Sequence, residues 1–214
     1  MGQDFAKDYE KDSKSPKPIH SGPHHQRLQR VAARILPLAK NDWDVPYSVT
    51  LLDTDEVNAF AVPGGPIYFN RGLMELVESD DEVAAVLGHE ATHIVKRHSA
   101  RQMSDSALKG ALAEVLLSRS GKTAQALARI GLEVKSLEFS RGDESESDKI
   151  GFGYMVQAGY SPEAMASFFR KLQKKAGDGN RKTAFLNSHP LTSARIEAAE
   201  RMAAASRAQG RTAP

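Results

Sequence analysis

Two histidines four residues apart, with a glutamate directly after the first, are the residues whose types and spacing could do chemistry. His89, Glu90 and His93 stand in the order His-Glu-Ala-Thr-His. Residues four apart on a helix lie about 40° from one another, so both imidazoles can reach one ion about 2.1 Å from each nitrogen. The glutamate is rotated by about 100°, where it can take a proton from a metal-bound water without binding the metal. The segment predicts one zinc ion held by His89 and His93, with Glu90 as general base.

The flanking sequence favours a helix for this motif, because apolar residues recur at helical spacing on both sides of it: Val83, Ala84, Val86, Leu87, Ile94 and Val95. Ser79 or Asp80 can cap the helix, which we expect to run past His98. On such a helix His98 lies about 180° from His89, so it should pack or face solvent and not bind the same ion. The alternative is a chance match in a buried helix with two hydrogen-bonded histidines.

A third ligand must come from elsewhere in the chain. Lys96 and Ser99 occupy the places where a metzincin has glycine and histidine, so that class is excluded. A carboxylate from a later helix is the other common solution, and the candidates are Glu114, Glu133, Glu138, Glu144 and Glu146. Among them only Glu144 has an acid four residues later, Asp148, which could orient a metal-binding imidazole. The alternative is that both acids belong to a solvated helix start.

The elements around these residues predict an α+β fold that is mostly helical and zincin-like, with a small antiparallel sheet before the motif helix. Short β-prone runs lie at 47–52, 58–62 and 67–70, the last two joined by Pro-Gly-Gly-Pro. Helical patterns cover 26–39, about 80–98, 105–117, 123–137, 143–158, a segment after Ser161 and a segment after Pro190.

Composition limits the other functions. The 214 residues suit one domain, which we place at 23–205, between a polar leader at 1–22 and a flexible tail at 206–214. The formal charge is +2 and the basic residues are dispersed, so a nucleic-acid partner is not expected. No apolar stretch is long enough to span a membrane. The chain has no cysteine, which excludes disulfides and thiol chemistry.

At four segments the sequence resembles the family of HtpX and the CAAX prenyl endopeptidases, especially its soluble bacterial periplasmic members. These segments are Asn58 to Gly65 with Gly72-Leu73, Gly88 to His98, Ser140-Arg141 with Glu144 and Asp148, and His189-Pro190 with Arg195-Ile196. Ser147 departs from the family, which usually has alanine there, but a small residue still fits. The resemblance implies zinc as cofactor and Glu144 as its third ligand.

The same resemblance places His189 in the site, where it would either stabilise the oxyanion or occupy the fourth zinc position and hold the enzyme inactive. A histidine that only anchors a loop is the alternative. Arg195 would brace that segment.

The expected reaction is hydrolysis of peptide bonds in unfolded or misassembled proteins. Substrate would lie extended along Asn58, Ala59, Phe60 and Ala61, because pairing with a strand edge accepts many sequences. By resemblance we expect a periplasmic or cell-envelope location, with the cytoplasm as the alternative. The rival function is a zinc-stabilised chaperone or adaptor with latent or no proteolysis.

Overall fold

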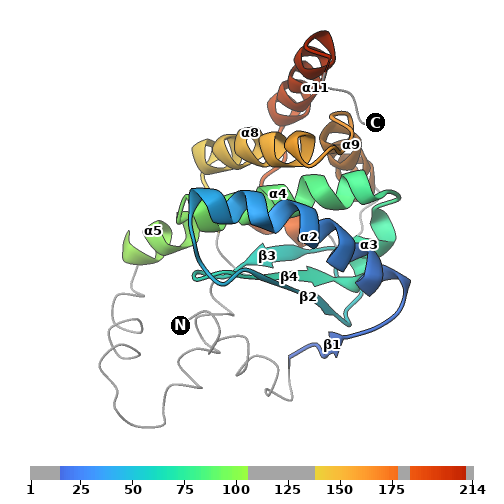
Figure 1. Cartoon of the computed structure of the whole chain (residues 1–214), viewed down its shortest axis with the longest axis vertical. Helices are drawn as coiled ribbons and strands as arrows, with labels where there is room; N and C mark the ends of the chain where they lie inside the picture. The colour runs from blue at the N-terminus through green and yellow to red at the C-terminus, as the bar shows by residue number, and fades with distance from the viewer. Residues whose placement is uncertain (1–14, 106–137, 178–183, 211–214) are drawn as a thin grey trace.

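The computed structural model describes residues 15–105, 138–177 and 184–210. A small sheet lies beneath a layer of helices, which confirms the α+β class (Figure 1). The strands are β1 (Pro18–Ile19), β2 (Ser48–Leu52), β3 (Ala59–Ala61) and β4 (Pro66–Asn70). The helices are α2 (Pro23–Asp42), α3 (Arg71–Leu76), α4 (Asp80–Val95), α5 (His98–Asp105), α8 (Arg141–Gln157), α9 (Ala164–Gly177), α10 (Phe185–Ser188) and α11 (Ser193–Ala208).

The sheet is mixed, which corrects the expectation of antiparallel pairing throughout. Its order is β1-β2-β4-β3, with β2 and β4 parallel and β3 and β4 antiparallel. After β2 the chain crosses to the far edge of the sheet and forms β3. A hairpin then leads into β4, which lies between β3 and β2 and runs parallel to β2. The segment Pro18–Ile19, expected to belong to the leader, pairs with β2. Pro18 and Ile19 therefore belong to the sheet.

Helix α4 is the centre of the domain. Every residue from Glu82 to Ile94 is buried. It packs against α2, α8, α9 and β3, and Figure 1 shows it running between α8 and the sheet. A helix that is covered on all sides can hold polar groups away from water only if neighbouring elements supply their partners.

Helix α4 ends at Val95, so the expectation that it runs past His98 is wrong. Arg97 has a φ of 56°, a left-handed conformation that a residue other than glycine rarely adopts. Its guanidinium lies over the Trp43 ring, 4.7 Å from the centroid, which holds the turn in place. Helix α5 then starts in a new direction at His98.

Helix α8 crosses α4 at a contact between two glycines. A β-carbon on Gly151 would lie 2.6 Å from the Gly88 carbonyl carbon and 2.6 Å from the His89 nitrogen. The absence of both side chains lets the two helix backbones approach each other. Glu144 and Asp148 lie on the same face of α8 as Gly151, at helical spacings of four and seven residues. The glycine contact therefore sets those two acids against the motif helix.

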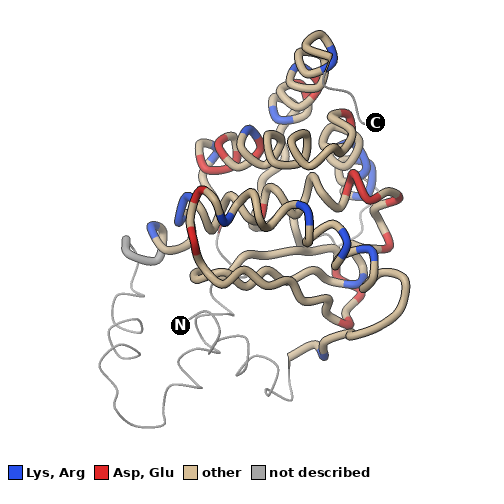
Figure 2. Tube along the Cα trace, viewed as in Figure 1, with Lys and Arg blue, Asp and Glu red and all other residues tan. Residues whose placement is uncertain are grey.

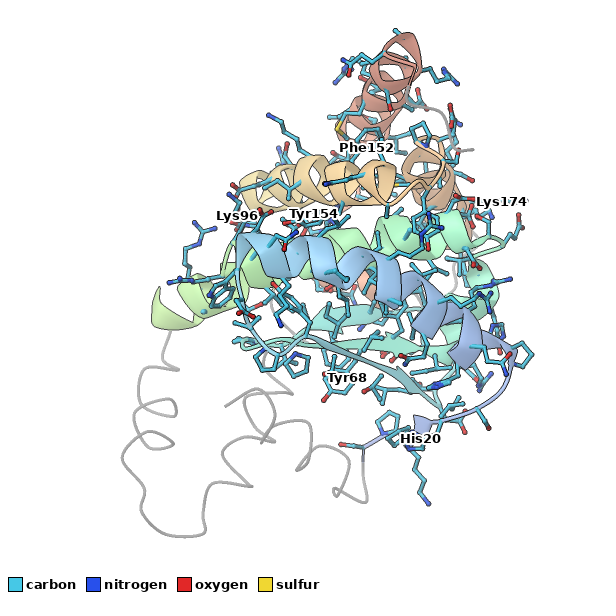
Figure 3. All side chains as sticks on the ribbon, viewed as in Figure 1. His20, Tyr68, Lys96, Phe152, Tyr154 and Lys174 are labelled. Atoms are coloured by element: carbon cyan, nitrogen blue, oxygen red, sulfur yellow. The ribbon has the colours of Figure 1, made fainter. Side chains whose placement is uncertain are left out.

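The remaining elements follow their local signals. Ser140 and Asp143 form a capping box at the start of α8. The Tyr154 hydroxyl, labelled in Figure 3, donates to Asp42 and joins α8 to α2. Helix α11 continues to Ala208, beyond the expected start of the tail. The helices expected at 105–117 and 123–137 lie mostly or entirely outside the described residues.

Charged residues are spread over the domain. Figure 2 shows Lys and Arg on several helices, interspersed with Asp and Glu, which agrees with the dispersed charge of the sequence. Within the described ranges no helix combines the length and apolarity needed to cross a bilayer.

Candidate metal centre

Four buried side chains from three parts of the fold come together in the interior of the domain. His89 and His93 come from α4, Glu144 from α8, and His189 from the residue after α10. One potential ligand atom of each lies within 4.8 Å of the others. Each of the four is at most 3% exposed. The spacing argument thus led to Glu144, and the structure brings it to the two motif histidines.

The atoms that face one another are acceptors, which is the arrangement a cation needs. The Nε2 atoms of His89 and His93 are 3.0 Å apart, and the Glu144 carboxylate lies 3.4 Å from His93 Nε2 and 3.6 Å from His89 Nε2. Burial lowers the pKa of His89, but the Glu144 and Asp148 carboxylates outweigh it and raise that pKa. Burial instead lowers the pKa of His93 well below its usual value, which keeps that ring neutral and able to bind a metal ion. Two imidazoles with one carboxylate are a donor set that suits zinc.

A carboxylate and a guanidinium lie behind His89. Its Nδ1 is 2.9 Å from Asp148 Oδ1, so the neutral ring donates there and directs Nε2 into the cluster. Arg195 donates to both oxygens of Asp148, from Nε and Nη2, each at 2.7 Å. Its Nη1 donates to the Pro190 carbonyl at 2.9 Å and lies 2.5 Å from Glu144 Oε2. Arg195 therefore ties the two acids of α8 to the segment that carries His189.

Glu90 is buried beside the cluster, and the Ala61 backbone N–H lies toward it without forming a well-aligned hydrogen bond. It is 1% exposed, and neither carboxylate oxygen has a hydrogen-bond partner among the described residues. Burial raises its pKa above the ordinary glutamate value. The His189 Nε2 atom is 3.5 Å from its Oε1. A carboxyl with a raised pKa next to a candidate metal site suits a general base.

His189 lies between two carboxylates. Its Nδ1 is 2.9 Å from Glu144 Oε1 and 3.2 Å from His89 Nε2, while Nε2 faces Glu90. The ring stacks on Phe185 with centroids 4.4 Å apart. Both alternatives that place His189 in the site agree with this position, whereas a residue that only anchors a loop would not need to enter the cluster.

The other expected residues lie as follows. Glu138 is exposed, Glu146 contacts His98 outside the cluster, and Glu114 and Glu133 are outside the described part of the chain. Strand β3 is an edge strand packed near α4, and Asn58, Ala59, Phe60 and Ala61 are all buried, between 0% and 5% exposed. Substrate pairing along this strand stays a prediction.

Sequence reasoning missed His98. It is 1% exposed, and its Nδ1 lies 2.9 Å from Nδ1 of His93. The expectation that it packs is right, but its place beside a candidate ligand depends on the turn at Arg97. No glycine or proline marks that turn in the sequence.

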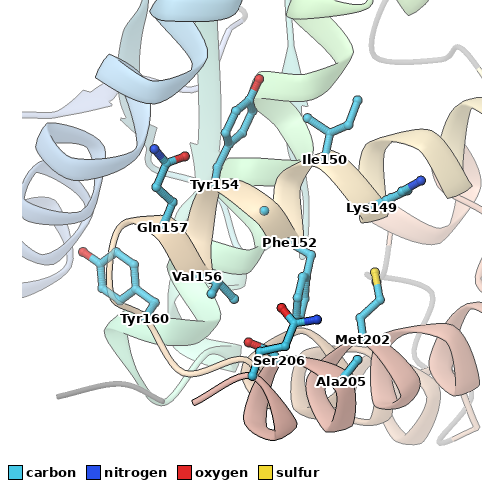
Figure 4. A pocket seen from close by; sticks show the side chains of 12 residues that line it. Lys149, Ile150, Phe152, Tyr154, Val156, Gln157, Tyr160, Met202, Ala205 and Ser206 are labelled. Carbon is cyan, nitrogen blue, oxygen red and sulfur yellow. The ribbon is translucent and has the colours of Figure 1, made fainter. Parts of the chain in front are cut away.

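A groove of about 960 Å³ lies away from this cluster, between α8 and α11. Its lining residues include Ile150, Phe152, Tyr154 and Met202 (Figure 4). None of the four clustered residues lines it.

A comparison with protein-family models matches residues 23–203 to peptidase family M48. The chain belongs to peptidase family M48. This confirms the expected kinship with the HtpX and CAAX endopeptidase type. The M48 domain is 30% identical over 181 residues to the beta-barrel assembly-enhancing protease of Escherichia coli K12, covering 80% of this chain and 37% of that protein.

Other relatives extend the comparison. The mitochondrial metalloendopeptidase OMA1 of Schizosaccharomyces pombe is 31% identical over 176 residues, 81% of this chain and 51% of that protein. Metalloprotease YcaL of Escherichia coli K12 is 29% identical over 192 residues, 88% of this chain and 73% of that protein. The M48 domain thus spans just over a third of the first relative and about half of the second.

Proposed function

We propose that this M48 domain is a zinc-dependent endopeptidase that hydrolyses unfolded or misassembled polypeptides. His89, His93 and Glu144 would hold one zinc ion. The observation that carries the proposal is the convergence of these acceptors around one point, next to the buried carboxylate of Glu90. Zinc, when bound, polarises the substrate carbonyl and lowers the pKa of a water molecule towards about 7.

The protein's own groups supply the proton transfers and the geometry. Glu90 takes the proton of the attacking water on a carboxylate oxygen and later gives it to the leaving nitrogen. Asp148 holds the His89 ring by its Nδ1–H, and Arg195 fixes Asp148 with two hydrogen bonds. Enclosure of these groups excludes bulk water and strengthens their electrostatic interactions.

His189 decides whether this site is ready to cut. Its ring fills the space between Glu144 and Glu90, which fits a latch in the fourth metal position. The same ring could stabilise the oxyanion once substrate is bound. Replacement by alanine separates the two roles, because a latch predicts faster cleavage in His189→Ala and an oxyanion donor predicts slower cleavage.

The substrate and the location are inferred from the activities of related proteins and from strand β3. A beta-barrel assembly-enhancing protease among the relatives supports protein quality control in the cell envelope, with a cytoplasmic role as the alternative. An unfolded chain would add to the edge of β3 by backbone pairing.

The test is metal analysis combined with casein digestion, with and without a chelator, on the parent chain and two variants. We expect about one zinc per chain and chelator-sensitive cleavage. Glu90→Gln should keep the zinc and lose cleavage, and Glu144→Ala should lose most of the zinc. Normal cleavage by Glu90→Gln would remove Glu90 as the base, and normal zinc in Glu144→Ala would remove the third ligand.

The rival is a zinc-stabilised chaperone or adaptor, favoured by the burial of the whole cluster. It predicts tight zinc and no turnover even in His189→Ala. A chain that prevents aggregation of a denatured client but never cleaves casein, in parent or variant, would establish it.

A further inference from the structure

We infer that His98 is a positioning residue for His93, part of a relay in which Glu146 holds His98 and His98 holds His93. The relay would keep the proton of His93 on Nδ1 and present Nε2 to the metal. This inference rests on the proposed metal site, because it concerns how one proposed ligand is oriented.

The backbone places His98 for this contact. With Arg97 in the left-handed region, α5 turns away from α4 and His98 folds back against the preceding turn. Its Nδ1 lies 2.9 Å from His93 Nδ1. Phe139 covers the His93 ring on one face, with centroids 4.0 Å apart, so the two imidazoles meet away from water.

The hydrogen-bond partners fix the direction of the relay. Among the described residues, His98 Nε2 faces Glu146 Oε2 at 3.0 Å and Asp143 Oδ1 at 3.4 Å. A carboxylate only accepts, so Nε2 carries the proton of the neutral ring and Nδ1 is the acceptor. His93 Nδ1 faces this acceptor at 2.9 Å, closer than the 3.4 Å between His93 Nε2 and Glu144 Oε1. We therefore place the His93 proton on Nδ1, with the lone pair of Nε2 toward the proposed metal position. Ser147 Oγ, 3.3 Å from His98 Nδ1, is a weaker second partner.

The two motif histidines are therefore held in different ways. His89 donates directly to a buried carboxylate, Asp148. His93 donates to a neutral imidazole, and the carboxylate behind it, Glu146, reaches the surface with its side chain 40% exposed. Lys96 lies 3.3 Å from Glu146. Outer partners of this kind fix the tautomer and orientation of a metal-binding histidine.

The first experiment uses the full chain without metal. Long-range proton–nitrogen NMR correlations, at a pH where the rings are neutral, report which nitrogen of His93 carries the proton. We expect Nδ1–H in the parent chain and a shift towards Nε2–H in His98→Leu. A parent chain with His93 protonated on Nε2 would overturn the inference. This result does not depend on whether the chain binds zinc or cleaves peptides.

The second experiment measures zinc affinity by competition with a chromogenic chelator. His98→Leu should weaken binding roughly 10-fold or more, which is typical for loss of an outer partner. His98→Gln should recover part of the affinity, because its amide can accept from His93 and donate to Glu146. Thr92→Val is the control: Thr92 is buried on the same helix, and its hydroxyl bonds only the Gly88 carbonyl among the described contacts.

Glu146→Gln covers the case in which His98→Leu does not fold, because Glu146 lies at the surface. It should weaken zinc binding less than His98→Leu and leave the thermal midpoint of the metal-free chain unchanged. If His98→Leu or, failing that, Glu146→Gln binds zinc as tightly as Thr92→Val, His98 only packs. A parent chain that binds no zinc would instead defeat the proposed function, and the tautomer measurement would still decide the contact.

Discussion

Helix α4 buries two glutamates, Glu82 near its start and Glu90 past its middle, in opposite surroundings. Glu82 is 4% exposed and Glu90 is 1% exposed, eight residues later on the same helix. Glu82 accepts hydrogen bonds from the Glu78 nitrogen at 2.8 Å, the Ser167 hydroxyl at 2.7 Å and Lys171 Nζ at 2.8 Å. Glu90 accepts none within the described part of the chain.

The pKa values follow these surroundings. Burial raises the pKa of Glu82, but Lys171, the Glu78 backbone and Ser167 outweigh it, and the pKa falls below its usual value. At Glu90 burial dominates and the pKa rises. A buried carboxylate that is fully hydrogen-bonded stabilises the fold. A buried carboxylate without hydrogen bonds lowers stability, and such groups are typical of functional sites. Glu82 thus anchors the start of α4, whereas Glu90 is the proposed general base.

The largest expected effect is on catalysis, and it should appear at one glutamate only. Glu90→Gln should lower kcat by about 10²- to 10⁴-fold, since general base catalysis contributes on that scale. Glu82→Gln should leave kcat near that of the parent at a temperature where the chain is folded. Casein cleavage by the two purified variants measures this. Equal losses of kcat in both would contradict the different roles assigned to Glu82 and Glu90.

The next effect concerns the glycine contact midway along the helix. Gly151→Ala should lower the free energy of unfolding by about 3 kcal/mol, because its new carbon meets backbone that cannot move aside. It should also weaken zinc binding, since α8 carries Glu144. Gly153→Ala is the control on the same helix: nothing lies within 4 Å of its new carbon, and a gain of about 0.5–1 kcal/mol is expected. Urea unfolding of both variants measures these free energies, and equal values for the two would contradict the proposed glycine contact.

The anchor itself is tested by Glu82→Gln. Loss of the charge-assisted bonds should lower the free energy of unfolding by about 1.5–3 kcal/mol at pH 7. Glu90→Gln should not destabilise the chain, because it removes a buried charge that lacks partners. Urea midpoints of the two variants give the comparison, and a larger loss at Glu90 would show that its carboxylate supports the fold.

The same anchor predicts a pH dependence. The pKa of Glu82 is lowered in the folded state, so its contribution is complete above the unfolded glutamate value of about 4.3 and is lost as pH falls through the lower folded value. Stability of the parent chain should therefore decline more steeply than that of Glu82→Gln as pH is lowered through this range. Parallel curves of stability against pH for the parent chain and Glu82→Gln would contradict the lowered pKa of Glu82.

The smallest effect is at the helix cap. The Ser79 hydroxyl accepts from the Glu82 nitrogen at 3.2 Å, so Ser79→Ala should cost about 1 kcal/mol and leave zinc content unchanged. Thermal unfolding with metal analysis measures both. A loss of zinc in this variant would mean that the anchor and the reaction site are not independent.

Much of the candidate site could be predicted from the sequence, because the spacing of residues on a helix is a local property. The interval from His89 to His93 and from Glu144 to Asp148 fixes which side chains share a face, whatever surrounds the helix. The zinc ligands and their roles remain predictions, but the structure places these residues together. The mixed sheet could not be predicted from the sequence, because the relative direction of β2 and β4 depends on where the chain crosses between β2 and β3.

By itself, the sequence predicted the motif helix, a cap at Ser79 or Asp80, Glu144 as the candidate third ligand and the α+β class, since periodicity and capping act over a few residues. Only the tertiary structure decided the break at Arg97, whose guanidinium lies over the distant Trp43 ring, and hence the position of His98. It also decided that Glu82 meets Lys171 while Glu90 accepts no well-formed hydrogen bond among the described residues. Two glutamates on one helix differ because of what packs against them, and that is set by contacts far apart in the chain.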